Sequence, residues 1–472
     1  MRNRNARYLV IAAALLVAAP LACAQARHDW TQFGFNAART SASTAPTGID
    51  AKNVATLQRQ QVSLDGTVDA SVIYLSAVDV KGAPHDAFFL TTTYGKTEAI
   101  DAHTGAVLWT YAPPNYDSWL GTYRITNTTP VADPDRRYLY AASPDGVIQK
   151  LAVADGRALW RTAITNLPQR EKIASSLNFD RGRVLAVVGG YVGDEPPYQG
   201  HVAILSAASG KLLHVWNALC SDRHHLLQPA SCPEQMAAIW GRAGAAVDPA
   251  TGDILVATGN GKWDGHAYWG DAFIALDRDA TRIVANYTPT NTAELDQTDA
   301  DIGSTSPVPL GDGIVAQGGK DGKIRLLDLK TIAGADPIQG REVQIVPTPG
   351  STDLFTAPAY WRGRDGAWLF VADNRGTAAW KYVHGRLQPG WSNDRPGTSP
   401  VWAGGLLYVY DPHDGGLYVY EPTTGRQLTV LACGHGHWNS PIVVNGMVAL
   451  PEGNANRHQA SGVLDIWRLP SH

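Results

Sequence analysis

Oxygen-bearing side chains stand in a few short, turn-like segments of this chain. Glu195 lies in a Gly-Asp-Glu-Pro-Pro run, Asn260 stands between two glycines, and Asp299 and Asp301 form an Asp-x-Asp pair. Carboxylate and amide oxygens are the ligands that hard cations prefer, and an ionised carboxylate can remove a proton from a substrate. These residue types suit metal binding or general base catalysis if the fold brings the segments together.

The same segments also have a purely structural interpretation. The Glu195 run is compatible with a solvated loop, and Asn260 with a left-handed turn position. Asp299 and Asp301 can cap the turn that precedes Ser304, and Lys320 in Gly-Lys-Asp-Gly can be an ordinary turn lysine. Each motif taken alone favours the structural interpretation, whereas their combination favours a site.

A second cluster, Cys433-Gly-His435-Gly-His437-Trp438, contains ligand types that transition metals accept. The three side chains alternate along one predicted strand, and no second segment supplies further ligands. Packing at a strand edge is therefore the favoured interpretation. Cys433 is expected to be a small buried hydrophobe rather than a reactive thiol.

The amino-acid composition indicates which secondary-structure elements must position these residues. The 472 residues carry 39 Lys and Arg against 43 Asp and Glu, which argues against a nucleic-acid partner. With 44% hydrophobic and 17% charged residues, the chain is too apolar to be disordered. The 47 glycines and 29 prolines indicate many turns and short strands. After residue 24 no apolar run is long enough to span a bilayer.

The first segment has the features of a secretory leader. Arg2, Arg4 and Arg7 precede an apolar stretch that ends before Ala22-Cys23-Ala24. We expect residues 1–24 to be a cleaved signal peptide, with cleavage after Ala26 as the alternative, and a periplasmic or secreted protein. Pro20 stands where lipoprotein signals prefer an aliphatic residue, which disfavours a lipid anchor at Cys23.

Export to an oxidising compartment bears on the cysteines. Cys220 and Cys232 flank a short polar loop, so a disulfide between them is predicted. The chain lacks a Cys-x-x-Cys-His motif, and covalently attached haem is not expected.

One unit recurs along the chain: an alternating strand, a tight turn, and a second strand that leads into an Asp-x-x-Thr-Gly-like turn. Clear copies are Asp101-Ala-His-Thr-Gly105 followed by Val107-Leu108-Trp109, and Glu421-Pro-Thr-Thr-Gly425. Such repeats indicate an all-β fold, an eight-bladed β-propeller of four-stranded antiparallel sheets, with seven blades as the alternative. We expect residues 25–472 to form one domain and residues 29–34 to join the last blade. Each turn tryptophan should lie flat against the next sheet.

The Asp-x-x-Thr-Gly-x-x-Leu-Trp pattern resembles the repeat of pyrroloquinoline-quinone (PQQ) proteins, and Trp30-Thr-Gln-Phe-Gly34 is similar to their start. The propeller lipoprotein that assists outer-membrane protein assembly has the same repeat. The resemblance covers the mature chain and implies the fold more specifically than the activity.

The resemblance to quinoprotein alcohol dehydrogenases implies roles for particular residues. It implies Glu195, Asn260, Asp299 and Asp301 as ligands of Ca²⁺ or a lanthanide ion, with Asp299 also as the catalytic base. It implies Trp240 beneath the quinone rings and Lys320 against the quinone oxygens. The implied activity is oxidation of an alcohol or polyol, with electrons passed to a separate acceptor such as a cytochrome.

The chain also departs from that pattern. The adjacent cysteine pair of the family is replaced by residues 124–129, Arg-Ile-Thr-Asn-Thr-Thr. This departure favours an alternative function, a non-catalytic propeller that binds envelope proteins or peptides through exposed strand edges and loops.

Overall fold

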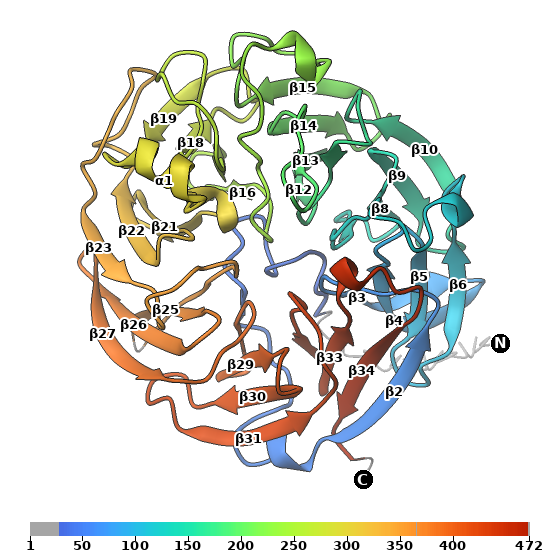
Figure 1. Ribbon diagram of the computed structural model, residues 1–472. Coiled ribbons are helices and arrows are strands. Elements are labelled where there is room, and N and C mark those ends of the chain that lie inside the picture. Colours follow the sequence, from blue (N-terminus) through green and yellow to red (C-terminus); the bar gives the residue numbers. More distant parts are fainter. Residues whose placement is uncertain (1–27, 365, 471–472) are drawn as a thin grey trace, which may run out of the picture.

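The computed structural model describes residues 28–364 and 366–470, and it forms a ring of eight β-sheets (Figure 1). The predicted eight-bladed propeller is confirmed. The predicted leader and Cys23 lie outside the described residues. Within the described ranges, no helix has the length and apolarity that crossing a membrane requires.

The blades follow one another along the chain, and we number them 1 to 8. Blades 1 to 4 consist of β3 (Ile73–Val80), β4 (Ala83–Thr91), β5 (Thr97–Asp101) and β6 (Val107–Tyr111); β7 (Val131–Ala132), β8 (Tyr138–Ser143), β9 (Val147–Ala152) and β10 (Ala158–Ala163); β11 (Glu171–Lys172), β12 (Asn178–Asp180), β13 (Arg183–Gly190), β14 (His201–Ser206) and β15 (Leu212–Asn217); and β16 (Ala246–Val247), β17 (Ile254–Ala257), β18 (Phe273–Leu276) and β19 (Ile283–Tyr287).

Blades 5 to 8 consist of β20 (Val308–Gly311), β21 (Ile314–Gly318), β22 (Lys323–Asp328) and β23 (Gln344–Pro347); β24 (Ala359–Gly363), β25 (Gly366–Ala372), β26 (Thr377–Val383) and β27 (Arg386–Asn393); β28 (Val401–Ala403), β29 (Leu406–Asp411), β30 (Gly416–Tyr420) and β31 (Gln427–Ala432), with β1 (Ala42–Ser43) added in parallel to β28; and β32 (Ile442–Val444), β33 (Met447–Glu452), β34 (Gly462–Arg468) and β2 (Gln58–Leu64). The helices are α1 (Thr292–Thr298) and the 3₁₀ turns η1 (Val54–Thr56), η2 (Tyr116–Ser118), η3 (Pro229–Ser231), η4 (Ile302–Ser304) and η5 (Ala455–Arg457).

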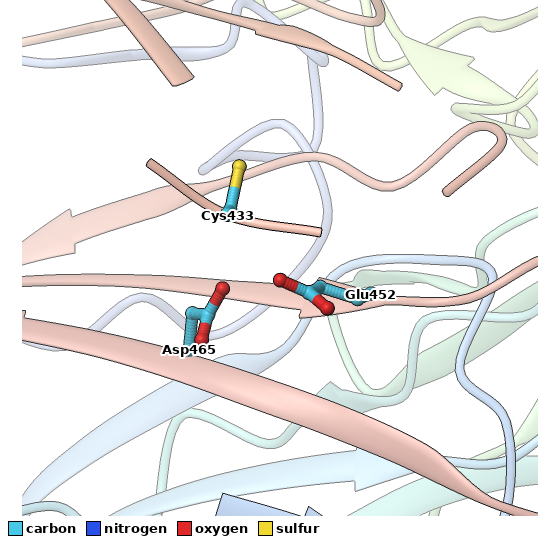
Figure 2. A group of neighbouring side chains, drawn as sticks. All are labelled: Cys433, Glu452 and Asp465. Carbon is cyan, nitrogen blue, oxygen red and sulfur yellow. The ribbon is translucent and has the colours of Figure 1, made fainter. Parts of the chain in front are cut away.

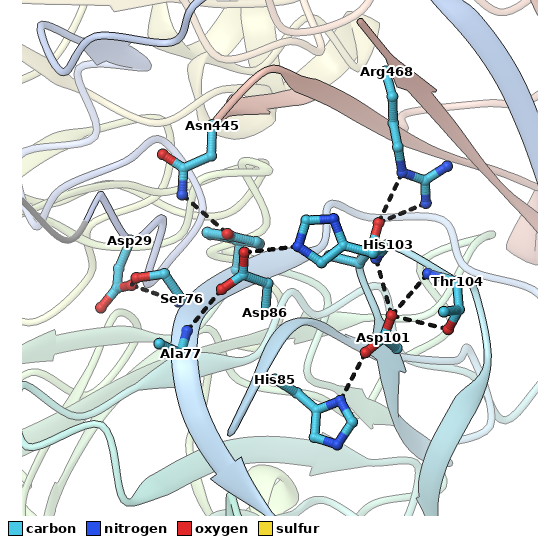
Figure 3. Close-up of polar contacts among 12 residues, drawn as sticks. Asp29, Ser76, Ala77, His85, Asp86, Asp101, His103, Thr104, Asn445 and Arg468 are labelled. Carbon is cyan, nitrogen blue, oxygen red and sulfur yellow. Dashed lines mark hydrogen bonds and ion pairs between the residues drawn. The ribbon is translucent and has the colours of Figure 1, made fainter. Parts of the chain in front are cut away.

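The Asp-x-x-Thr-Gly turn owes its recurrence to side-chain capping, as the first copy shows (Figure 3). Asp101 Oδ1 accepts hydrogen bonds from the backbone amides of His103 and Thr104 and from the Thr104 hydroxyl, at 3.0, 2.7 and 2.9 Å. Gly105 then adopts a left-handed conformation with φ of 77°. An aspartate and a glycine at these positions fold the turn locally.

The turn tryptophans lock neighbouring blades together, as predicted. In three places the indole of one blade lies on the turn glycine of the next; these pairs are Trp109 with Gly156, Trp160 with Gly210, and Trp391 with Gly425. A Cβ at Gly156 would stand 2.6 Å from Trp109 Cε3. The indole Nε1 of Trp109 also donates to the Val153 carbonyl at 2.8 Å. Burial of these large rings ties adjacent sheets together.

The ring closes through β2, not through residues 29–34 as expected. β2 pairs antiparallel with β34 over seven residues and completes blade 8. The segment 29–34 instead crosses to blade 1, where Trp30 and Tyr74 exchange backbone hydrogen bonds. The alternation of buried and exposed residues in β2, with Val62 and Leu64 buried, suits a strand, whereas the segment 31–37 consists of turns and bends.

The predicted disulfide is confirmed, since Cys220 and Cys232 are bonded between blades 3 and 4. Both half-cystines are buried in the hydrophobic cluster that joins these two blades. The bond therefore fixes the long connection from β15 to β16.

Candidate functional site

Four of the polar residues singled out in the sequence meet on the loops of blades 4 and 5. Asp299 caps the C-terminus of α1 in a left-handed conformation (φ 56°), and Asp301 directly precedes η4. Asn260 follows β17, and Lys320 lies in the turn between β21 and β22. Lys320 is fixed to this loop because its backbone amide donates to the Asp301 carbonyl at 2.9 Å.

Lys320 is the centre of these contacts. Its ammonium forms ion pairs with Asp301 Oδ2 at 2.6 Å and with Asp299 Oδ1. Asn260 Nδ2 donates to the same Asp299 oxygen at 2.5 Å. Both hydrogen bonds to the Asp299 side chain end on Oδ1, which leaves Oδ2 directed to no partner among the described residues. We call Asn260, Asp299, Asp301 and Lys320 the lysine cluster.

The two carboxylates of the lysine cluster lie in different surroundings. The Asp299 side chain is 67% exposed, whereas that of Asp301 is 2% exposed. Burial raises the pKa of Asp301 to about 6, although the Lys320 ammonium opposes this rise. Burial by itself would lower the pKa of Lys320, but Asp301 and Asp299 outweigh it and raise that pKa. Asp299 is thus the carboxylate open to a substrate, and Asp301 the buried one.

Asp271, a residue that the sequence interpretation missed, lies behind the lysine cluster. It is completely buried, and its carboxyl lies near the Ile302 backbone amide without forming a full hydrogen bond. Burial, together with the negative charges of Asp301 and Asp296, raises its pKa to about 9. Asp271 is accordingly protonated at neutral pH, and it adds no negative charge to the site.

Trp240 joins the lysine cluster to an aromatic group at the hub. Lys320 Nζ lies 5.4 Å from the centre of the Trp240 ring. A Cβ at Gly259 would stand 3.2 Å from Trp240 Nε1 and 3.3 Å from Asp301 Oδ1, so the space between these two side chains is tight for a larger residue. The ring centres of Trp240, Phe355 and Trp438 are 5.9 to 6.5 Å apart. The indole of Trp240 therefore lies beside the charged residues, as an aromatic wall of the hub.

Glu195 stands apart from the lysine cluster. Its side chain is 70% exposed and forms an ion pair with Arg170. Asp194 accepts a hydrogen bond from the Tyr198 hydroxyl at 2.8 Å within the same loop between β13 and β14. In the described part of the chain, no hydrogen bond or ion pair connects Glu195 with Asp299 or Asn260.

The carboxylate that blade 3 does bury is Glu171, which the sequence interpretation also missed. It is 2% exposed, accepts from the Gln199 amide at 3.0 Å, and is hydrogen-bonded by the Thr165 hydroxyl. Burial raises its pKa. A glutamate directly after an arginine in a polar loop gave no sequence signal of burial.

The lysine cluster offers oxygen ligands of the kind that a hard cation binds. Asn260 Oδ1 and Asp301 Oδ1 are buried, and neither accepts a full hydrogen bond within residues 28–364 and 366–470, although the Trp240 indole N–H lies close enough to the Asp301 carboxylate to oppose the rise of its pKa. Together with the Asp299 carboxylate they form an amide and carboxylate donor set. In this structure the Lys320 ammonium forms ion pairs with both carboxylates and balances one of their two negative charges. The side chains fit a cation in their chemistry, and an ion bound there would compete with Lys320.

Two neighbouring cations at the hub form no direct ion pair with an acidic side chain in the part of the chain that the structure describes. Arg242 and Lys172 are buried, and neither forms an ion pair within 4.0 Å among the described residues. Arg242 lies 3.4 Å from the centre of the Trp438 ring. Burial and the charge of Arg242 lower the pKa of Lys172 to about 7. Asp69 is their buried counter-charge, but it lies beyond ion-pair distance from both, so an anionic ligand at the hub could pair with them more directly.

His437 belongs to a separate network around Asp69. His437 Nδ1 lies 2.7 Å from Asp69 Oδ2, and the Trp438 amide donates to Asp69 Oδ1 at 3.0 Å. Asn127 and the Ala455 amide complete the shell of this buried carboxylate, both at 3.0 Å. Asp69 thus ties the loops of blades 1, 2 and 8 together.

Cys433 lies opposite two carboxylates on β33 and β34, Glu452 and Asp465 (Figure 2). Arg59 on β2 already pairs with both, at 3.0 Å from Glu452 and 2.8 Å from Asp465. Burial and the two negative charges raise the pKa of the Cys433 thiol. The thiol is accordingly a poor nucleophile. It is half-buried and faces two carboxylates, so its surroundings differ from the buried apolar position expected for it.

Comparisons with known proteins agree with this architecture. Residues 49–224 match a family model described as outer membrane protein assembly factor BamB. A polyvinylalcohol dehydrogenase of Sphingopyxis sp. (strain 113P3) is 24% identical over 214 residues, which cover 42% of this chain and 31% of the relative. The dehydrogenase subunit of the quinone alcohol dehydrogenase from Acetobacter aceti is 23% identical over 462 residues, which cover 81% of this chain and 60% of the relative.

Among solved structures, a europium-containing methanol dehydrogenase is similar with a TM-score of 0.70 and 16% identity, over 93% of this chain and 98% of that chain. The fold is thus that of a quinoprotein-type propeller, and the resemblance predicted from the repeats is confirmed. The chain spans between about a third and three-fifths of the length of the curated relatives it matches.

Proposed function

We propose that this protein is a quinoprotein-like oxidoreductase that oxidises an alcohol or polyol. The observation that carries the proposal is the convergence of Asn260, Asp299, Asp301 and Lys320 beside the Trp240 ring, from segments far apart in the sequence. The names of the dehydrogenase relatives support the same class of reaction. The leader-like segment supports a periplasmic or secreted location, and electrons would pass to a separate acceptor such as a cytochrome.

In this proposal Asp299 takes the proton of the substrate hydroxyl. Its side chain is exposed, and Asn260 and Lys320 both hold Oδ1, which leaves Oδ2 for the substrate. Because two donors fix the carboxylate, its orientation does not have to be established during the reaction.

The cofactor proposed is PQQ with Ca²⁺ or a lanthanide ion. Bound PQQ would accept the hydride, and the ion would polarise it as a Lewis acid. Asn260, Asp299 and Asp301 would hold the ion, while Trp240 and Lys320 would contact the quinone. The buried cations Arg242 and Lys172 support an anionic, carboxylate-bearing cofactor. Glu195, which is exposed and pairs with Arg170, is not included in this ligand set.

Reconstitution tests the proposal. The purified protein is titrated with PQQ plus Ca²⁺ or La³⁺, binding is followed by tryptophan fluorescence, and alcohol-dependent dye reduction is assayed. Asp299→Asn should retain binding and lose at least about 100-fold in kcat, because general base catalysis contributes about that much. Asp296→Asn, on the exposed side of α1, is the matched control. Absence of PQQ binding with either ion would contradict the proposal.

A second candidate function is a non-catalytic propeller that binds envelope proteins or peptides. The family-model match and an exposed apolar patch favour it: Val192 and Tyr123 are 76% and 52% exposed, and Tyr123 packs edge-on against Tyr191. Specific co-purification of envelope proteins that is lost in Val192→Asp but survives Asp299→Asn would support this function. Equal recovery of envelope proteins with the native protein, Val192→Asp and Asp299→Asn would contradict it.

A further inference from the structure

A cavity at the hub lies between the loops of blades 6, 7 and 8. It encloses about 460 Å³, and we call it the hub pocket. Asn374 lines it from blade 6, and Thr398 and His413 from blade 7. His437 precedes blade 8, and Arg457 ends the 3₁₀ turn η5 within that blade. A cavity of this volume accommodates a ligand of the size of a monosaccharide.

Arg457 supplies the permanent charge among the described residues that line the hub pocket. The histidines 413, 435 and 437 also line it, and none of its described lining residues is an aspartate or a glutamate. Arg242 adds a second guanidinium behind the wall, against Trp438. Arginine binds carboxylates through two parallel hydrogen bonds. The pocket therefore favours a ligand that carries a carboxylate.

Thr398 provides independent evidence of a ligand. Its side chain lines the hub pocket and the residue is 2% exposed, yet its Oγ1 has no hydrogen-bond partner within the described residues. Its backbone amide is already satisfied by the Tyr410 carbonyl at 2.7 Å. A buried hydroxyl without a partner is costly, and a ligand hydroxyl would satisfy it.

A second residue that lines the hub pocket, His437, is held in a fixed orientation. Asp69 binds His437 at Nδ1, so the ring presents its other nitrogen, Nε2, away from the network. Asn374 and Asn454 add neutral donors and acceptors along the rim. Several fixed hydrogen-bonding groups around one arginine match a molecule that has several hydroxyls and one acidic group.

We propose that the hub pocket binds a sugar acid, with Arg457 on its carboxylate and Thr398, His437 and Asn374 on its hydroxyls. The pocket borders the candidate active site, since Phe355 and Trp438 line it and pack against Trp240. If the proposed oxidoreductase function is correct, the bound sugar acid is its substrate. The binding itself does not depend on that function.

Calorimetric titration of the full chain without quinone tests the proposal, with D-glucuronate, D-glucose and inorganic phosphate as probes. D-Glucuronate should bind more tightly than the other two. Arg457→Gln should weaken its binding at least tenfold, since a hydrogen bond to a charged group is worth about 2 kcal/mol. Thr398→Val should weaken it several-fold. Arg457→Lys should retain part of the affinity, and Arg426→Gln, an exposed arginine on the rim of blade 7, should leave it unchanged.

Several results would overturn the inference: equal binding of D-glucose, tighter binding of phosphate, or an Arg457→Gln variant with unchanged affinity for D-glucuronate. The quinone titration separates this inference from the proposed function. If the protein binds D-glucuronate but takes up no PQQ, only the proposed oxidoreductase function is contradicted. Dye-linked oxidation of a neutral alcohol by a protein that does not bind D-glucuronate contradicts only the hub-pocket ligand.

Discussion

The ammonium of Lys320 lies 2.6 Å from Asp301 Oδ2, and Asp301 is a carboxylate from which solvent is almost completely excluded. Asp299 binds the same ammonium from the exposed side. A single lysine thus forms ion pairs with two acidic side chains in different surroundings. This arrangement makes Lys320 the residue on which both the stability of the loop and the orientation of the proposed base depend.

Replacement of this lysine should destabilise the protein in a pH-dependent manner. The folded-state pKa of Asp301, about 6, lies above its ordinary value of 3.8, so Asp301 favours folding in acid and this contribution is lost as the pH rises through about 6. Lys320→Met removes the charge that opposes the shift and raises this pKa further. We expect Lys320→Met to lower the free energy of unfolding by about 2 kcal/mol at pH 8 and by less at pH 5.

Urea unfolding at the two pH values measures this effect. Lys323→Met is the matched control, because Lys323 is exposed and its ion pair with Asp321 spans 3.6 Å. Its unfolding free energy should change by less than about 0.5 kcal/mol. If Lys320→Met lowers the free energy of unfolding equally at pH 5 and pH 8, the assigned ion pair between Lys320 and the buried Asp301 is contradicted.

Two glycine-to-alanine substitutions separate tryptophan docking from backbone strain. Gly156 has φ of 72°, and a Cβ there would overlap the Trp109 ring. Gly182 has φ of 77°, but no atom lies within 4 Å of the position of its Cβ. We expect Gly156→Ala to cost about 3 kcal/mol and Gly182→Ala about 1 kcal/mol, since only the first displaces an indole. Equal losses in thermal or urea unfolding would show that docking contributes little.

Removal of the disulfide should weaken the connection between blades 3 and 4. The bond closes a loop with a sequence separation of 12, for which the chain-entropy model gives about 3 kcal/mol. The double variant Cys220→Ser, Cys232→Ser should lose about this amount in urea unfolding. Cys433→Ala serves as the control for loss of a thiol alone. The addition of reductant should destabilise the native protein but leave the double variant unchanged.

Asp69 should make the hub sensitive to acid. Burial by itself would raise its pKa, but His437 and Arg242 outweigh it and lower that pKa well below 3.8. Its contribution to stability is therefore present above about pH 4 and is lost as the pH falls further. Asp69→Asn should cost about 3 kcal/mol at pH 7, because it leaves Arg242 and Lys172 without a buried counter-charge.

The difference between Asp69→Asn and the native protein should shrink as the pH falls from 5 towards 2, as measured by urea unfolding at each pH. Asp135→Asn, at an exposed position between β7 and β8, provides the control. A difference that stays constant over this range would contradict the assigned ionisation of Asp69.

Much of the architecture could be predicted from short segments. The Asp101 turn forms through hydrogen bonds within four residues, and its glycine and following tryptophan lie in the same stretch of chain. The repeat therefore predicted the number and kind of blades. The strand that closes the ring was misassigned, because the partner of β2 is β34, some 400 residues further along the chain.

The candidate site could be predicted only in part. Asn260, Asp299, Asp301, Lys320 and Trp240 were all singled out, and the structure brings them together. Glu195 was singled out with them but pairs with Arg170 on an exposed loop. Glu171, Asp271 and Asp69 gave no signal, because burial of a carboxylate depends on which distant segments cover it.

The sequence by itself determined the repeated turn, the propeller and the disulfide, since each depends on residue types at fixed, short spacings. Only the tertiary structure decided which side chains share the hub, where Lys320 pairs with two acids and Arg242 and Lys172 remain without ion pairs among the described residues. The physical reason is that electrostatic energy depends on distance and solvent exclusion. Both are set by the packing of eight sheets around one axis, and neither can be seen in a single repeat.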